Sequence, residues 1–259
     1  MMLEYPPGVL LALAVACGAA VGSFLNVCIY RLPLSKSVVS PPSACPTCNR
    51  RLEWYENIPI VSYLVLRGRC RTCGSSIGQQ YPIVEALTAI MFGAAWWYYG
   101  PGVLLVSRLI FGCALIVLFA IDLEHHLLPN AITLPGIAAG FIFSFFTEPG
   151  WMSSLIGILA GGGLLYAIAE AYYRLRHEEG LGMGDVKMLA MVGAFVGWQL
   201  TFLTLMMASV AGSVIGIGLI VTKRGGMKYA LPFGTFLALG AAAAATVGPT
   251  ILRWYLERL

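Results

Sequence analysis

The segments IDLEHHLLPN (residues 121–130) and GMGDVK (residues 182–187) hold the two aspartates of this chain, Asp122 and Asp185. Each aspartate stands where an apolar run of helix length meets a polar segment. A carboxylate at a membrane edge is costly to keep there, so it is a functional candidate by default. The sequence therefore directs attention to these two positions and to the fold that would place them.

The amino-acid composition excludes a soluble globular protein. Of the 259 residues, 59% are hydrophobic and 11% are charged, with a mean hydropathy of +0.81. Soluble domains carry about 25% charged residues. The long apolar runs indicate helices, because a membrane barrel would show short alternating segments instead. The net charge of +4 comes with no nucleic-acid motif, so we expect membrane lipid around the chain and no nucleic-acid partner.

The apolar runs predict an all-α polytopic membrane protein with about eight transmembrane helices. Crossing the hydrocarbon core takes about 20 apolar residues. The predicted spans are 8–30, 82–100, 103–121, 131–147, 152–173, 186–198, 200–222 and 231–253.

The distribution of basic residues predicts the orientation of these spans. With the N-terminus outside, 13 of the 16 Lys and Arg residues fall on the cytoplasmic side, among them Lys223, Arg224 and Lys228. An excess of this kind marks the cytoplasmic face. Asp122 then lies at the inner end of the third span and Asp185 at the inner end of the sixth, so both carboxylates face the cytoplasm.

Four cysteines predict a metal site in the polar region 31–81, inserted after the first helix. They form two C-x-x-C pairs with 21 residues between them, at Cys45, Cys48, Cys70 and Cys73. Two such pairs complete a tetrahedron, for which Zn²⁺ is the usual occupant. Disulfides or a redox pair are the alternatives, and a reducing cytosol disfavours disulfides. A structural zinc ion would stabilise a small cytoplasmic domain that has little core of its own.

The aspartate pair is suited to peptide hydrolysis. Two carboxylates held about 3 Å apart share one proton, so that one can act as base and the other as acid. Gly182 and Gly184 remove side chains beside Asp185 and would let a substrate backbone approach closely. Lys187 is interpreted as an anchor on the cytoplasmic face or as an electrostatic contributor.

Three other interpretations of the aspartates remain open from residue types alone. Asp122 could end a helix among lipid headgroups, and Asp185 could be the N-cap of the helix that follows a Gly-rich turn. The two carboxylates could also form the ion site of a cation- or proton-coupled transporter.

Further motifs carry a resemblance to a known family. They are GSFLNV (22–27), YRLP (30–33), ENIP (56–59), YPIVE (81–85) and LLPN (127–130), together with the two cysteine pairs and GMGDVK. In this order they closely resemble the bacterial prepilin peptidases, or type IV leader peptidases, of the GxGD aspartic protease group.

The resemblance implies a function. Family members cut the leader from type IV prepilins or type II secretion pseudopilins at the cytoplasmic face of the bacterial inner membrane. They commonly methylate the new N-terminal amine with S-adenosylmethionine. By resemblance, Asp122 and Asp185 are the catalytic aspartates, and Gly68 and the four cysteines belong to the methyltransferase region. The implied domains are a first transmembrane helix (1–30), a four-cysteine region (31–81) and a transmembrane peptidase domain (82–259). A catalytically idle scaffold for pilus assembly is a further alternative.

Overall fold

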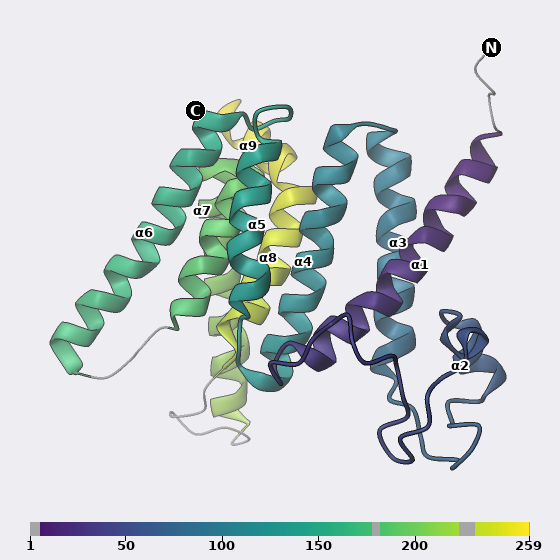
Figure 1. The fold of residues 1–259 in the computed structure, drawn as a ribbon. Helices are drawn as coiled ribbons and strands as arrows, with labels where there is room; N and C mark the ends of the chain where they lie inside the picture. Colours follow the sequence, from purple (N-terminus) through teal and green to yellow (C-terminus); the bar gives the residue numbers. More distant parts are fainter. Residues whose placement is uncertain (1–5, 178–181, 223–230, 259) are drawn as a thin grey trace. The chain divides into compact units, whose positions relative to one another are not determined.

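The computed structural model describes residues 6–177, 182–222 and 231–258, and within them the chain is helical, as predicted (Figure 1). Lys223, Arg224 and Lys228, which contribute to the predicted orientation, lie outside the described residues. The chain divides into two compact units, Met1–Leu105 and Val106–Leu259. In the described residues, β-pairing is limited to two isolated bridges, Ala44 with Arg51 and Arg69 with Ser76.

The first unit is built on a helix pair. Helix α1 (Pro7–Arg31) packs along α3 (Gln80–Tyr99). The contact is close because glycines of α1 face α3: a Cβ added at Gly18 would lie 2.7 Å from the Cβ of Phe92, and one at Gly22 would lie 2.7 Å from the Cα of Glu85. Between the two helices, the chain forms the 3₁₀ helix η1 (Trp54–Asn57) and the short α2 (Val61–Val65).

The second unit contains six helices in its described part. They are α4 (Val103–His125), α5 (Asn130–Phe143), α6 (Trp151–Arg176), α7 (Met183–Val221), α8 (Phe233–Thr246) and α9 (Gly248–Leu256). Their shared core is apolar and includes Phe111 and Leu118 of α4, Met188 and Leu189 of α7, and Leu237 of α8.

Helix α7 is a hairpin of two helical arms. The backbone leaves the helical conformation at Gly197, where φ is 78° and ψ is 170°. Gly184 near the start of α7 and Gly234 at the start of α8 both contact Leu128, and Gly216 near the end of α7 contacts Leu231, just before α8. The start and the end of α7 therefore lie at the same end of this unit, as Figure 1 also shows. The first arm overlaps the predicted span 186–198 and the second arm overlaps the predicted span 200–222.

Glycines also hold α6 against the first arm of α7. A Cβ at Gly157 would lie 2.6 Å from the carbonyl oxygen of Gly193, and a Cβ at Gly161 would lie 3.0 Å from that of Leu189. Close backbone approach through small residues is the usual way in which membrane helices associate, because lipid gives them no hydrophobic drive to do so.

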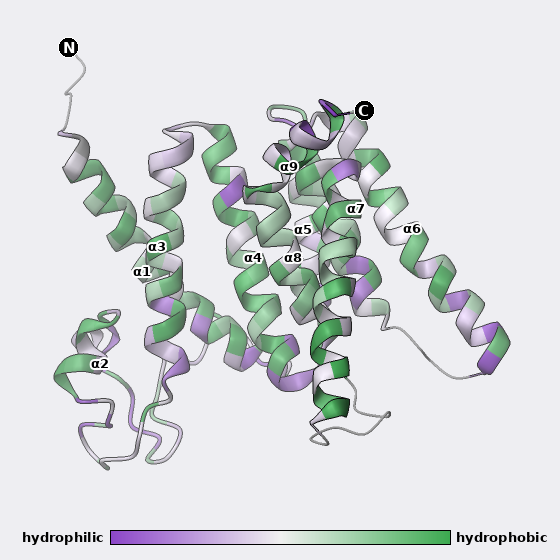
Figure 2. Cartoon of the chain, turned by 180° about the vertical axis from the view of Figure 1, so that it is seen from behind, coloured by the Kyte–Doolittle hydropathy of each residue, from purple (hydrophilic) through white to green (hydrophobic). Residues whose placement is uncertain are grey.

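Fewer described helices than the predicted eight have the length and hydropathy of a membrane crossing. Four described helices are long and apolar enough to cross a membrane, namely α1, α4, α6 and α7, and a fifth counts if α8 and α9, bent by 64°, form one span. The predicted eight spans are not confirmed by this criterion. Figure 2 shows mostly hydrophobic colours along the helices and hydrophilic residues in the segment around α2.

We predict opposite effects for the same substitution at two glycines of α6. Gly157→Ala should destabilise the protein by about 1–3 kcal/mol, because its methyl group would force α6 away from α7. Gly163→Ala should be neutral or stabilising by up to about 1 kcal/mol, because nothing lies within 4 Å of a Cβ there and alanine is the better helix former. Thermal unfolding of the detergent-solubilised variants measures both, and equal melting temperatures would contradict the described helix contact.

Candidate functional site

Asp122 lies buried in the last turn of α4 and is held by the first turn of α8. Its Oδ2 accepts a hydrogen bond from the backbone N–H of Thr235 at 2.6 Å and another from the Thr235 hydroxyl at 3.0 Å. The first N–H groups of any α-helix lack partners within that helix. The Asp122 carboxylate therefore caps α8 from a distant part of the chain.

Asp185 lies in the first turn of α7 and is half-buried. Its N–H donates to the carbonyl oxygen of Gly182 at 3.1 Å, and its carboxylate is hydrogen-bonded to the Gly182 backbone. It also interacts electrostatically with Asp122. The structure thus brings the two aspartates of the sequence, 63 positions apart, into one site.

Leu128 joins the three elements that carry this site. A Cβ at Gly184 would lie 2.9 Å from the Cβ of Leu128, and a Cβ at Gly234 would lie 2.8 Å from its Cδ1. Gly234 also faces the carboxylate, since its Cβ would lie 3.0 Å from Asp122 Oδ2. Glycine is therefore needed at both helix starts for the loop after α4 to pack against them.

The glycines of GMGD have different surroundings. Gly184 faces Leu128, which gives it a packing role that the sequence did not indicate. Gly182 is exposed at the N-cap of α7, and its Cβ would lie 3.3 Å from Asp185 Oδ2. Closeness to a substrate backbone remains a prediction for both residues.

Lys187 has a polar partner on another helix. Its Nζ donates to Oδ1 of Asn130, the first residue of α5, at 2.9 Å. This bond ties the start of α5 to the start of α7. His126 follows α4 in the left-handed region, with φ 51°, and interacts electrostatically with Asp122.

Thr235 and Gly234 are the site residues that sequence reasoning missed. The nearest signal is the proline of LPFGT (231–235), which marks a helix start. A threonine in the first turn of a helix is common, and nothing local to it indicates a partner 113 positions away.

The four predicted cysteines come together in the first unit. Their Sγ atoms all lie within 4.8 Å of one another, with Cys45 and Cys73 3.8 Å apart. This spacing suits a single tetrahedral metal ion bound by four sulfurs. Backbone N–H groups of Cys48 and Thr47 bond to the Cys45 sulfur and, with other contacts, lower the pKa of this thiol to about 5.

The two cysteine loops have the same backbone geometry. The N–H of Asn49 donates to the carbonyl of Cys45 and that of Gly74 to the carbonyl of Cys70, both at 2.9 Å. The donor residue has positive φ in each loop, 54° at Asn49 and 69° at Gly74. The two loops therefore have matching turns, and the sulfurs of both loops gather in one cluster.

An ion pair connects the first cysteine loop to η1. Arg50 Nη2 donates to both carboxylate oxygens of Glu56, at 2.6 and 2.8 Å. The Glu53 N–H donates to the same carboxylate at 2.9 Å. These bonds, led by the one from Arg50, hold the pKa of Glu56 below its usual value. They stabilise the loop at neutral pH, and this contribution is lost as the pH falls through the pKa of Glu56.

Gly68 precedes the second cysteine loop in a conformation that suits glycine, with φ 66°. A Cβ there would lie 2.9 Å from the hydroxyl oxygen of Tyr63. Its N–H donates to the Tyr63 carbonyl at 2.9 Å, and its own carbonyl accepts from Ile77 at 2.7 Å. These contacts give Gly68 a local structural role, and its assignment to methyl transfer stays a prediction.

Two motif residues, Asn26 of α1 and Glu85 of α3, connect these helices to neighbouring parts of the chain in the first unit. Asn26 Nδ2 donates to the carbonyl of Tyr81 at 3.0 Å. The buried carboxylate of Glu85 accepts the N–H of Ile60 at 2.7 Å. Ile60 has a φ of 62°, which is rare for a β-branched residue, so this bond helps to hold a strained turn.

The helical fold and the paired carboxylates define a multi-pass membrane protein with an aspartate site. Comparison with known protein families identifies the class of membrane protein. Residues 16–99 match the Bacterial Peptidase A24 N-terminal domain and residues 109–217 match the Type IV leader peptidase family. The chain belongs to the type IV leader peptidase family.

Individual relatives agree with this assignment. The chain is 37% identical to the prepilin leader peptidase/N-methyltransferase of Aeromonas hydrophila, over 91% of this chain and 90% of the relative. It is 36% identical to the protein of the same name from Burkholderia pseudomallei (strain 1026b), over 94% and 87%. For the Pseudomonas aeruginosa protein the identity is 34%, over 93% and 91%. No solved structure matches the chain.

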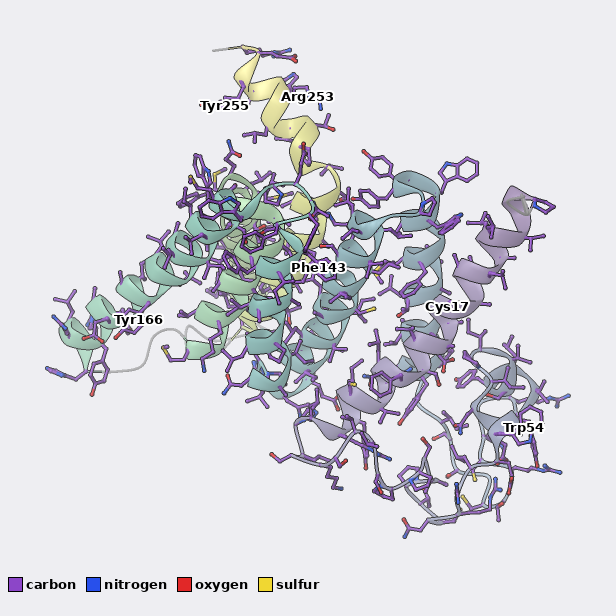
Figure 3. The ribbon with its side chains drawn as sticks, turned by 45° about the horizontal axis from the view of Figure 1, so that its top comes forward. Cys17, Trp54, Phe143, Tyr166, Arg253 and Tyr255 are labelled. Atoms are coloured by element: carbon purple, nitrogen blue, oxygen red, sulfur yellow. The ribbon has the colours of Figure 1, made fainter. Side chains whose placement is uncertain are left out.

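We predict that the cysteine cluster binds one metal ion. Cys45→Ser should reduce the metal content of the purified protein from about one ion per chain to nearly none, because three sulfurs no longer complete the tetrahedron. Cys17→Ser is the matched control, since Cys17 lies on α1 outside the cluster and is exposed (Figure 3). Elemental analysis measures the content, and metal retained by the Cys45 variant would contradict the site.

Proposed function

We propose that this protein cleaves the leader from type IV prepilins or type II secretion pseudopilins and then methylates the new N-terminal amine with S-adenosylmethionine. The observation that carries the peptidase part is the meeting of Asp122 and Asp185 at the ends of α4 and α7. The printed names of the relatives supply the substrate class and the second activity.

The proposed chemistry needs both carboxylates. One aspartate takes a proton from water as the water attacks the scissile carbonyl carbon, and the other gives a proton to the carbonyl oxygen. Burial of Asp122 restricts water at the site, which strengthens electrostatic interactions there. We propose that the substrate helix approaches through the bilayer, so that its leader reaches the carboxylates at the membrane edge.

We further propose eight membrane crossings, with the aspartates at the cytoplasmic face of the bacterial inner membrane. The hairpin form of α7 supports this number, since each arm would cross once. The excess of Lys and Arg in the loops at this face supports the orientation.

In this proposal the four-cysteine region is a cytoplasmic domain stabilised by zinc. The four sulfurs of the cluster would hold the ion, which would add folding energy to a segment with two short helices. We assign methyl transfer to the region 31–81, with Gly68 in it, and peptide cleavage to 82–259. S-adenosylmethionine would supply the methyl group.

The transporter alternative is not supported. The family match and the names of the relatives describe a peptidase and an N-methyltransferase. The same family match and names also favour an active enzyme over a catalytically idle scaffold.

We predict that Asp122→Asn and Asp185→Asn each lower leader cleavage by at least about 100-fold, because each removes an acid/base group. Glu170→Gln is the control, since Glu170 pairs with Arg174 on the partly exposed surface of α6, and it should cleave like the wild type. Mass spectrometry of a prepilin incubated with enzyme and S-adenosylmethionine reports leader loss and methyl gain together. Normal turnover by either asparagine variant would exclude the aspartate mechanism.

A further inference from the structure

The two carboxylates of the site are held differently. Oδ2 of Asp122 accepts both the Thr235 N–H and the Thr235 hydroxyl. Within the described residues, the Asp185 carboxylate is hydrogen-bonded to the Gly182 backbone, and no side-chain donor to it is seen. When two carboxyl groups share one proton, the negative charge lies on the carboxylate that accepts more hydrogen bonds, because donors stabilise the ionised form.

The backbone N–H of Thr235 makes this difference a fixed one. Because an N–H can only donate, Asp122 Oδ2 must present a lone pair to Thr235 at 2.6 Å, and a proton that Asp122 takes up during the reaction belongs on its other oxygen, Oδ1. Hydrogen bonds from two donors favour the ionised form of a carboxylate. Gly234 allows the contact, since a Cβ at this position would lie 3.0 Å from Asp122 Oδ2.

We propose that Thr235 is a positioning residue that keeps Asp122 ionised as the base, so that Asp185 carries the shared proton as the acid. This assignment rests on the proposed peptidase function. It goes beyond that function because it gives each aspartate a separate role and assigns a new residue to the site.

The proton movements then balance. Asp122 takes a proton from water as the oxygen bonds to the scissile carbon, and Asp185 gives its proton to the carbonyl oxygen. When the carbon–nitrogen bond breaks, Asp122 gives its proton to the leaving amine and Asp185 recovers one from the tetrahedral intermediate. The products are a carboxylic acid and an amine, and both aspartates return to their starting states.

Two other titratable groups interact with Asp122, and a variant that tests Thr235 must leave both of them in place. They are Asp185 from the first turn of α7 and His126 from the residue that follows α4. The described part of α8 that contacts Asp122 contributes Gly234 and Thr235, neither of which titrates. A change confined to the Thr235 hydroxyl therefore alters the hydrogen bonding of Asp122 and leaves these charges in place.

The test is the pH profile of kcat/KM for leader cleavage by Thr235→Val. Valine keeps the shape and the backbone N–H and removes the hydroxyl donor. We expect the acidic limb of the profile to move to higher pH by about one unit, with the basic limb unmoved, because the ionised form of the base loses one of its two donors. Thr235→Ser, which keeps the hydroxyl, should restore the wild-type profile.

Thr204→Val is the matched control. Thr204 is also fully buried in the second unit, but its hydroxyl donates to the carbonyl of Leu200 within its own helix at 2.8 Å. Its profile should equal that of the wild type. If Thr235→Val does not fold, Thr235→Ala removes the same hydroxyl with a smaller side chain. The acidic limb of its kcat/KM profile is then compared with that of the wild type.

Two results would overturn the inference. An unmoved profile in Thr235→Val would show that the hydroxyl does not act on the ionised carboxylate. A shift of the basic limb alone would show that Asp122 is the proton carrier and Asp185 the base. Either result, with the wild type and Thr204→Val still cleaving the leader, leaves the proposed function intact, whereas absence of cleavage by the wild type would contradict that function itself.

Discussion

The Asp122 carboxylate bonded to the first turn of α8 is the interaction on which the second unit depends. A carboxylate buried among apolar helices is costly unless its oxygens are hydrogen-bonded. The free N–H groups at a helix start meet that need, and Thr235 adds its hydroxyl. The bond also fixes where α8 begins relative to the end of α4, so one contact serves both the fold and the site.

Close packing brings the second aspartate to the same place. Gly157 and Gly193 let α6 and the first arm of α7 approach backbone to backbone, and Gly197 lets the chain reverse between the arms. Leu128 then fills the space between the starts of α7 and α8. Because cores of this kind are densely packed, small residues at these positions determine how closely the carrying helices approach.

Much of the fold could be predicted from the sequence, because long apolar runs and paired cysteines are local signals. The helical segments and the gathering of Cys45 with its three partners follow from such signals. The number of crossings does not follow as directly, since α5 has only 14 residues and the two arms of α7 follow one another with the break at Gly197 between them. Thr235 could not be predicted, because its role depends on a residue 113 positions away. The contact of Gly184 with Leu128 could not be predicted either, because it depends on a loop that lies 56 positions earlier in the chain.

The most direct test of the account is whether the loop after α4 touches the start of α7 in the membrane. A protein with Leu128→Cys and Gly184→Cys should form a disulfide between these positions on mild oxidation. Their Cβ atoms would lie 2.9 Å apart, and a shift of about 1 Å, eased by the loss of the larger Leu128 side chain, brings them to the about 3.8 Å that a disulfide spans. Leu128→Cys with Gly163→Cys should form none, because nothing lies within 4 Å of a Cβ at position 163. Peptide mass spectrometry identifies the linked positions. Efficient cross-linking of the first pair is the predicted result, and its failure while both cysteines remain reactive would contradict the meeting of the two aspartate-bearing helix ends.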